Sequence, residues 1–395
     1  MENQKGQKIS TTSMKKILFI CPRSPFLERF SGDVIRAKKF IYFLSKNNYV
    51  KVLSPDFKDS KKKESKLSYE GFKEISFITK LFYVFFSLLK LQPMQLGYFF
   101  SPRIKEYIKN NYQNFDVIFF QSFRTAQYMP ENCKKKCVLD MGDLMSKNYR
   151  QTSARYFFFN PVRIIYFIES LLVKKYENLC FSRFDKILLL SKKEINFVKK
   201  EYKKKLAQIS FGINYINKKY KFHKENYKIL FIGNIKYAPN KNACYEFVNK
   251  ILPTINKVYS NIEFHIIGEI SKIDNFLLSK KKNVKILNEI KNLEPYLNKT
   301  ICGLANLKIA TGVQTKILTY MSYGIPSVCS KQVVNNFDSI KEGKINYYND
   351  NKELIKIIFK FKRDKNFSIS ASKRSLKVIK KFKWEKILPV LDKIL

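Results

Sequence analysis

The stretch Ala310–Ser330, ATGVQTKILTYMSYGIPSVCS, changes its hydrophobic period twice. Val313, Ile317 and Met321 recur every four residues, which is the spacing of a buried helix face. A glycine then ends the pattern, and the apolar residues Ile325–Cys329 predict a short buried strand. A helix followed at once by an apolar strand is typical of a parallel α/β sheet.

The beginning of this helix has the composition of an anion-binding site. Gly312 lets the backbone approach a ligand closely, and the free N–H groups of a helix start attract negative charge. Gln314 can donate to phosphate or ribose oxygens, and Lys316 can neutralise a diphosphate. Alternatively, the segment is an ordinary core helix with a solvated lysine, and the stretch by itself does not separate the two interpretations.

The charge balance of the chain points to a polyanion. The 395 residues include 76 Lys and Arg against 32 Asp and Glu, which gives a formal charge of +44. Nucleic acid, an anionic membrane surface and a phosphorylated substrate are all candidate partners. The lysines are spread along the whole chain, and an A/T-rich genome would encode a similar composition. We therefore expect a basic surface with no specific nucleic-acid site.

The cysteines and histidines do not predict a metal site. Seven Cys are scattered, only two His are present, and the neighbouring Cys133 and Cys137 have no histidine close by. The polar residues 1–13 lack the apolar core of a signal peptide, and the apolar run Leu81–Leu89 is too short to span a membrane. We expect a disordered tail over 1–13 and a cytoplasmic protein, either soluble or peripheral on the cytoplasmic membrane face.

Strand and helix patterns alternate through the chain in two series. The first runs from a strand at Lys15–Cys21 to a strand at Asp185–Ser191, and the second begins with a strand at Lys228–Gly233. Short apolar strands separated by helices indicate parallel sheets that are covered on both faces. We therefore predict two Rossmann-like domains, at 14–210 and 211–375, and a final helix over 376–395 that crosses back to the first domain.

One predicted helix of the first domain, Phe77–Leu91, is almost wholly apolar. Such a helix is most often part of a core, but it also fits an interfacial segment on a membrane. The residues Lys58–Lys66 before it predict a basic loop, which would add electrostatic attraction to anionic headgroups.

Ligands of open parallel sheets bind beyond the carboxyl ends of the strands, so residues that follow strands are candidates for the site. Gly233 and Lys236 follow the first strand of the second series. Asp140 and Asp143 follow a strand of the first series, where they can contact a transferred sugar or simply cap the loop.

Further candidates lie in the first domain. Asp33 and Arg36 open a predicted helix just after Gly32, and Asp33 can either cap that helix or meet a ligand. Arginines are rare in this lysine-rich chain, yet four of them fall near the predicted cleft: Arg23, Arg36, Arg124 and Arg150. Arginine binds phosphate and carboxylate through two parallel hydrogen bonds, which favours an anionic ligand at these positions.

The stretch from 312 to 328 resembles the C-terminal signature of the family 4 glycosyltransferases of the GT-B fold, which belong to the glycosyl transferases group 1. The matching positions are Gly312, Lys316, Leu318, Met321, Gly324, Pro326 and Val328. Other segments are similar to that family in the same order along the chain: 16–36 (KILFICPRSPFLERFSGDVIR), 138–143 (VLDMGD), 230–240 (LFIGNIKYAPN) and the closing helix from Trp384.

The resemblance implies an α/β protein of two facing Rossmann-like domains that transfers a hexosyl group from a nucleotide sugar to a glycan or lipid-linked acceptor. It further implies retention, no metal or other cofactor, and a role in surface polysaccharide synthesis. The implied donor-binding residues are Gly233, Lys236, Gly312, Val313, Gln314, Thr315, Lys316 and Thr319. The implied acceptor or phosphate loop comprises Gly32, Asp33, Arg36 and Arg124, and the implied catalytic residues are Asp140 and Asp143.

The chain departs from the family pattern at three places. The arginine and lysine that usually follow the first strand of the donor domain fall at Asn234 and Asn240, where Lys236, Lys241 or Lys308 could substitute. The two glutamates that the family carries eight residues apart fall at Thr311 and Thr319, and the histidine of the acidic loop falls at Gly142. No histidine precedes residue 223, so a histidine-based mechanism in the first domain is excluded. Two alternatives therefore stay open: a GT-B nucleotide-sugar epimerase or hydrolase, and a non-catalytic GT-B or basic polyanion-binding protein.

Overall fold

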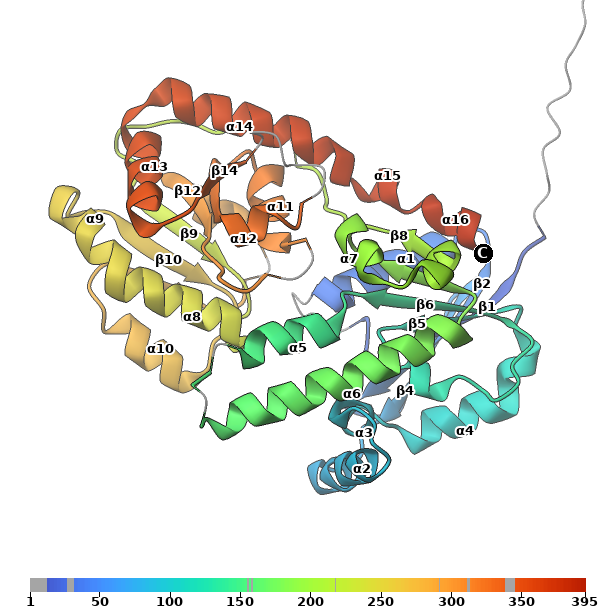
Figure 1. Cartoon of the computed structure of the whole chain (residues 1–395). Coiled ribbons are helices and arrows are strands. Elements are labelled where there is room, and N and C mark those ends of the chain that lie inside the picture. The colour runs from blue at the N-terminus through green and yellow to red at the C-terminus, as the bar shows by residue number, and fades with distance from the viewer. Residues whose placement is uncertain are drawn as a thin grey trace, which may run out of the picture.

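The computed structural model describes residues 13–26, 32–154, 156–157, 159–216, 218–290, 292–310, 313–337 and 345–395. Two sheets, each packed between helices, form two lobes that face each other (Figure 1). Within the described ranges, no helix combines the length and the apolar character needed to cross a membrane.

The first sheet has eight strands in the order β3-β4-β2-β1-β5-β6-β7-β8. Its neighbours are parallel except at the edge, where β3 runs antiparallel to β4. The strands are β1 (Lys16–Ile20), β2 (Tyr49–Asp56), β3 (Ser60–Lys63), β4 (Leu67–Lys73), β5 (Val117–Gln121), β6 (Lys136–Gly142), β7 (Lys186–Leu189) and β8 (Leu206–Gln208). The helices of this lobe are α1 (Gly32–Leu44), α2 (Phe77–Leu89), α3 (Met94–Tyr98), α4 (Pro102–Asn111), α5 (Met145–Ser153), α6 (Pro161–Arg183) and α7 (Lys192–Phe197).

The second sheet has six parallel strands in the order β11-β10-β9-β12-β13-β14. They are β9 (Lys228–Ile232), β10 (Glu263–Ile267), β11 (Val284–Leu287), β12 (Thr300–Ala305), β13 (Ser327–Ser330) and β14 (Asn346–Tyr348). The helices are α8 (Ala238–Glu246), α9 (Leu252–Val258), α10 (Lys272–Ser279), α11 (Thr315–Ser322), α12 (Lys331–Val334), α13 (Asn351–Arg363) and α14 (Lys365–Ile379). The central strands β9 and β12 are apolar over most of their length because helices cover both faces of the sheet.

Helix α11 is held on the second sheet by Tyr320. The Tyr320 ring is fully buried against Gly303, where an added Cβ would lie 2.3 Å from the ring. Its hydroxyl lies 3.1 Å from the carbonyl oxygens of Leu230 and Leu304, and accepts from the N–H of Ile232 at 2.9 Å. A buried hydroxyl with these partners fixes the helix relative to the strand ends, and it thereby positions Lys316 one turn earlier.

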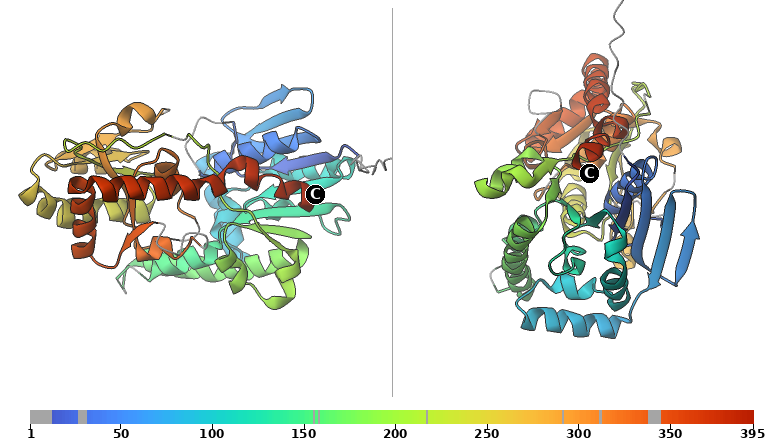
Figure 2. Two further views of the ribbon diagram at one scale, coloured as in Figure 1. Left: turned by 90° about the horizontal axis from the view of Figure 1, so that it is seen from above. Right: turned by 90° about the vertical axis from the view of Figure 1, so that its right-hand side faces the viewer.

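The C-terminal segment crosses from the second lobe to the first, through α14, α15 (Trp384–Ile387) and α16 (Val390–Ile394) (Figures 1 and 2). The carbonyl oxygen of Leu395 accepts hydrogen bonds from the Lys15 and Lys136 ammonium groups, at 2.5 and 3.1 Å. Where the chain passes between lobes, an added Cβ on Gly212 would lie 2.3 Å from the Trp384 ring, so the connection has no room for a side chain there.

The two-sheet α/β architecture expected from the sequence is confirmed, with two local corrections. The segment Lys58–Lys66 is not simply a loop, because it contains the edge strand β3. Helix α2 is not part of a core, because Ser87 is its one buried residue. Strands β4, β8 and β14 were not predicted, since their short and partly polar sequences carry a weak hydrophobic pattern.

Candidate functional site

A cavity of about 920 Å³ lies between the two lobes. On the first lobe it is lined by residues that follow β1, β2 and β4, together with residues from α2 and α3. On the second lobe it is lined by residues that follow β9 and β10 and by the start of α11. The carboxyl ends of both parallel sheets therefore meet at one site, as expected for ligand binding in open α/β sheets.

Two strand-end glycines bring the backbone of the second lobe to the cavity wall. Gly233 follows β9 with φ +156°, and Gly268 follows β10 with φ +139°; both φ values lie in a region that side chains other than glycine rarely adopt. An added Cβ on Gly268 would lie 2.1 Å from the Gly233 carbonyl oxygen. Because both residues are glycines, they present main-chain groups and no side chains to the cavity.

Lys316 is a buried cation on the donor-side wall. Only 6% of the residue is exposed, yet it lines the cavity, and its Nζ donates to Asn240 Oδ1 at 2.6 Å. The ammonium also lies 4.4 Å from the centre of the Phe231 ring. Among the described residues no carboxylate pairs with it, and burial lowers the pKa of Lys316 to about 7. An anionic ligand entering the cavity would restore the charged form.

The neighbours of Lys316 in the signature differ in their placement. Gln314, Thr315 and Thr319 line the cavity at the first turns of α11, and the Thr319 hydroxyl donates to the Thr315 carbonyl at 3.0 Å. Val313 instead packs against the hydrophobic core. Gly312, together with Thr311, lies outside the described residues.

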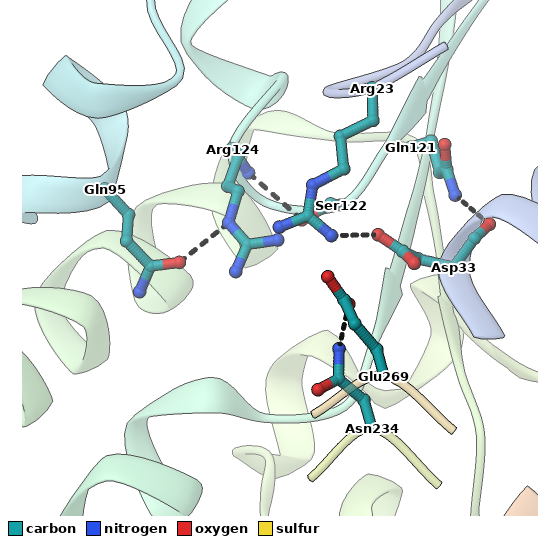
Figure 3. A network of polar contacts seen from close by, with 8 residues as sticks. All are labelled: Arg23, Asp33, Gln95, Gln121, Ser122, Arg124, Asn234 and Glu269. Atoms are coloured by element: carbon teal, nitrogen blue, oxygen red, sulfur yellow. Dashed lines mark hydrogen bonds and ion pairs between the residues drawn. The ribbon is translucent and has the colours of Figure 1, made fainter. Parts of the chain in front are cut away.

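Lys236 contributes to an exposed polar group beside the cavity. Its ammonium donates to Glu269 Oε1 at 2.7 Å, and the Asn234 amide donates to Glu269 Oε2 at 2.8 Å. Asn234 and Glu269 line the cavity, whereas Lys236 is not among the lining residues. Figure 3 shows the Glu269 carboxylate pointing from the second lobe toward the Arg23 and Asp33 side chains of the first.

On the opposite side, two arginines of the first lobe lie against one aromatic ring. The Arg23 and Arg124 guanidinium carbons lie 5.4 and 4.6 Å from the centre of the Phe99 ring. Arg23 pairs with Asp33 at 3.2 Å, and Arg124 donates to Gln95 Oε1 at 2.7 Å (Figure 3). Burial, with a smaller effect of the neighbouring Arg23 charge, lowers the pKa of Arg124. Arg23 and Phe99 line the cavity, whereas the predicted site residue Arg124 is not among the lining residues.

The start of α1 brings the two lobes into contact. An added Cβ on Gly32 would lie 3.5 Å from the Phe211 ring and 3.9 Å from Thr315 Cγ2, so α1 and α11 begin close to each other. Asp33 follows Gly32, and its carbonyl accepts from the Gln121 amide at 2.6 Å. The predicted first-domain loop and the predicted donor loop thus lie side by side.

Arg36 and Asp140 form a buried ion pair rather than lining the cavity. Their two hydrogen bonds measure 2.8 and 2.9 Å, and both residues are at most 4% exposed. Arg36 also donates to the Ser210 carbonyl at 3.1 Å. The paired geometry explains why charged residues are tolerated here, and it differs from our prediction that Asp140 contacts a sugar and Arg36 an acceptor or phosphate.

Asp143 lies near the junction of the lobes but is not among the cavity-lining residues. In the part of the chain that the structure describes, its buried Oδ1 has no hydrogen-bond partner. Burial, together with the charge of Asp140, raises the pKa of Asp143 to about 6. The neighbouring Glu194, whose Oε1 accepts from the Leu144 N–H at 2.8 Å, has its pKa raised to about 8, chiefly by burial and secondarily by Asp143.

Three of the residues that shape the cavity carried no signal of a site in the sequence. Phe99 and Tyr237 lie on helix ends or loops, where an aromatic side chain gives no positional signal, and Trp384 comes from the distant C-terminal segment. Trp384 was expected only as the start of a closing helix that crosses back to the first domain, not as a cavity residue. Asn240, the partner of Lys316, follows β9 as the strand-end rule requires, but the sequence singled it out only as a departure from the family pattern.

Residues 226–360 match the family model described as Glycosyl transferases group 1. The search of curated proteins gave no match. Similar solved structures include sucrose-phosphate synthase from Thermosynechococcus elongatus, with 12% identity, a TM-score of 0.71, and coverage of 96% of this chain and 98% of that one. TarM is similar with 11% identity, a TM-score of 0.66, and coverage of 98% of this chain and 99% of that one. Anabaena Alr3699/HepE in complex with UDP and glucose is similar with 11% identity, a TM-score of 0.64, and coverage of 96% of this chain and 98% of that one. At these identities the likeness shows the GT-B fold.

Proposed function

We propose that this protein is a glycosyltransferase that moves a sugar, of the hexosyl type, from a nucleotide-sugar donor to an acceptor with retention. The observation that carries the proposal is Lys316, a buried cation that lines the interlobe cavity and whose hydrogen-bond partner among the described residues is a neutral amide, Asn240. A diphosphate is the ligand that suits this position. A buried ammonium is costly without a partner of opposite charge, and the diphosphate supplies that negative charge.

The chemistry needs charge stabilisation more than a side-chain nucleophile. In the transfer, the bond between the anomeric carbon and the diphosphate oxygen breaks, and the diphosphate keeps the electron pair. The acceptor oxygen bonds to that carbon and releases its proton. Lys316 and the first N–H groups of α11 would stabilise the negative charge that develops on the leaving diphosphate. The proposal requires no metal, because the chain supplies this positive charge.

The first lobe would hold the acceptor. Arg23, which lines the cavity over Phe99, suits an acceptor with an anionic group, and the Glu269 carboxylate opposite is placed to accept from sugar hydroxyls (Figure 3). A glycan or lipid-linked acceptor in surface polysaccharide synthesis is our proposal for its class. Family 4 membership is likewise proposed, from the sequence signature and from the match over 226–360.

Thermal-shift and calorimetric titrations with UDP, GDP, ADP and dTDP, and with their sugars, test the donor half of the proposal. A ligand at 100 times its Kd should stabilise the native state by about 2.7 kcal/mol. We expect one nucleotide series to raise the melting temperature and the others to have little effect. If none of the diphosphates binds, the proposal is wrong.

Incubation of the bound nucleotide sugar without an acceptor separates the alternatives. An epimerase or a hydrolase would convert the donor to an epimer or to free sugar, which proton NMR of the anomeric signal detects. A transferase should leave most of the donor intact until an acceptor is added, and the product should then keep the anomeric configuration of the donor. Binding without any turnover, with or without acceptors, would favour the non-catalytic alternative.

A further inference from the structure

Helix α2 exposes nearly all of its apolar side chains. The helix has 13 residues, and Ser87 is the one that is buried. A surface helix normally turns its apolar side inward. A helix that is apolar and exposed therefore indicates that another molecule or a membrane covers this face when the protein functions. Its large hydrophobic side chains, between 39% and 79% exposed, are Phe77, Ile78, Leu81, Phe82, Phe85, Phe86 and Leu89.

The first half of α6 shows the same feature. Six of its apolar side chains are 37–53% exposed: Val162, Ile164, Ile165, Phe167, Ile168 and Leu171. Just before the helix, Phe157 and Phe159 are nearly fully exposed, with their ring centres 6.2 Å apart. Side chains of this size are rarely left in water in such number on one helix.

Helix α3 joins these two apolar faces into one surface, which we call the α2–α6 surface. It is made of α2, α3 and the exposed side of α6 with the residues just before it. An added Cβ on Gly97 of α3 would lie 2.2 Å from the Tyr83 carbonyl of α2, so the two helices are in direct contact. On the other side, the Glu169 carboxylate of α6 accepts from the Met94 and Gln95 N–H groups of α3, at 2.9 and 3.3 Å. Figure 1 shows α3 between α2 and α6.

The exposed charges of α2 and α6 have one sign. Helix α2 contains no acidic residue, and the two glutamates of α6, Glu169 and Glu177, are buried and accept hydrogen bonds from neighbouring groups. The acid nearest to α2, Glu74, is paired with Lys80. The basic residues on or next to these helices are Lys80, Lys90, Arg163, Lys174, Lys175 and Arg183. An apolar surface that carries basic charges, and whose described acids are buried or paired, complements an anionic lipid surface.

We propose that the α2–α6 surface seats the protein on an anionic lipid bilayer, with α2 lying in the interface. A helix of 13 residues is about 20 Å long, which is too short to cross the hydrocarbon core. A second copy of the chain is a poorer occupant, because an interface between identical surfaces would place basic side chains opposite one another. The edge strand β3 and its lysines, which the sequence suggested as the electrostatic element, are not part of this surface.

The α2–α6 surface lies next to the cavity, so membrane docking would bring a lipid-linked acceptor close to the site. Lys80 of α2 and the residues Tyr98, Phe99 and Phe100 at the end of α3 line the cavity. The helices that would lie on the bilayer therefore also form its acceptor-side wall. An acceptor with a lipid tail could keep the tail in the membrane while its sugar end reaches the cavity. This acceptor assignment rests on the proposed function, whereas membrane docking does not.

Co-sedimentation of the full chain with vesicles tests the docking. Vesicles of phosphatidylcholine alone are compared with vesicles containing 30% phosphatidylglycerol, at low and high salt. The variants are Phe82→Ser/Phe85→Ser on α2 and Ile164→Ser/Ile165→Ser on α6. The matched control is Ile273→Ser/Phe276→Ser on α10 of the second lobe, which removes side chains that are also exposed, by 72% and 59%. These side chains are all at the surface, so unchanged melting temperatures should confirm that each variant folds.

We expect wild type and the α10 control to bind the anionic vesicles alike, and each α2 or α6 variant to bind at least tenfold more weakly. High salt should weaken the binding of all of them, because the lysine contribution is screened. Failure of wild type to bind, or equal losses in the control, would overturn the proposal. A wild-type dimer that the α2 variant converts to a monomer, or tight RNA binding without vesicle binding, would do the same.

A parallel calorimetric titration with nucleoside diphosphates keeps the two proposals distinguishable. Variants of the α2–α6 surface should bind the diphosphate as wild type does, since the donor wall belongs to the second lobe. Vesicle binding without any diphosphate binding would remove the glycosyltransferase proposal and leave the docking surface standing.

Discussion

Replacing Lys316 with methionine should separate diphosphate binding from the folding of the chain. Methionine fills a similar buried volume without a charge. A charged hydrogen bond to a ligand contributes about 1.5–3 kcal/mol, so we expect the affinity for the diphosphate to fall by roughly 12- to 150-fold. The measurement is isothermal titration calorimetry at pH 6.5, where an ammonium with a pKa near 7 is largely protonated in the free protein.

The pH dependence provides a second, sharper readout of the same group. Binding needs the charged ammonium, so the affinity of wild type should fall as the pH rises above about 7, by at most about tenfold per pH unit. A nucleotide sugar is the better ligand here, because its diphosphate diester does not titrate in this range. The methionine variant should show no such slope.

Stability should change in the opposite direction with pH. The pKa of Lys316 is lower in the folded chain than the ordinary value of 10.5, so the unfolded chain binds more protons between about pH 7 and 10.5. The contribution of this residue to the free energy of unfolding therefore increases as the pH rises through that window. The variant should lack that increase in denaturant titrations.

Lys352→Met is the matched control, because it removes an exposed positive charge from the same lobe at a position outside the cavity. It should leave affinity and its pH slope unchanged, which shows that the general basic field is not responsible. Equal affinities of the Lys316→Met variant and wild type at pH 6.5 would refute the reasoning and make Lys316 a residue of the structure alone.

Three further predictions concern stability. The raised pKa of Glu194 means that the native state keeps this proton to a higher pH than the unfolded chain does, so wild-type stability should decrease as the pH rises from about 4.5 to 8. Glu194→Gln should flatten that decrease, and urea titrations across this pH range measure the free energy of unfolding of both proteins. Gly268→Ala should lower the melting temperature far more than Gly142→Ala. An added Cβ at 268 would lie 2.1 Å from a backbone atom, whereas one at 142 would meet nothing within 4 Å. Gly142→Ala should therefore cost only the strain of a left-handed backbone conformation, about 1–2 kcal/mol. Arg36→Met should cost about 3–5 kcal/mol, and the double change Arg36→Met/Asp140→Leu should recover much of it; activity lost without a loss of stability would instead indicate a catalytic role.

The signature around Lys316 shows where sequence patterns sufficed. Hydrophobic spacing placed the helix near 313–321, and the structure has it at Thr315–Ser322 with Lys316 on the cavity wall. The strand-end rule likewise found Gly233, which lines the cavity. These succeed because period and turn residues are local properties, and because a parallel sheet fixes where its carboxyl ends must lie.

The same rule selected Asp140 and Arg36, which the fold pairs with each other instead of aiming them at a ligand. Nothing local distinguishes a carboxylate that faces a cavity from one that meets a guanidinium 104 residues away in the sequence. The rule also could not find Phe99 or Trp384, because these residues reach the cavity through α3 and the crossing C-terminal segment.

The sequence by itself determined the alternation of strands and helices, the two-sheet α/β class and the glycine turns and lysine of the donor loop, since each depends on residues close together in the chain. Tertiary structure decided the rest. It buried Lys316 against a neutral amide, which lowers its pKa. It also left the apolar helix α2 on the outside, because α2 packs on α3 at the edge of the first lobe rather than between layers. Burial and exposure depend on which distant segments meet, and hydrophobic period alone does not specify that.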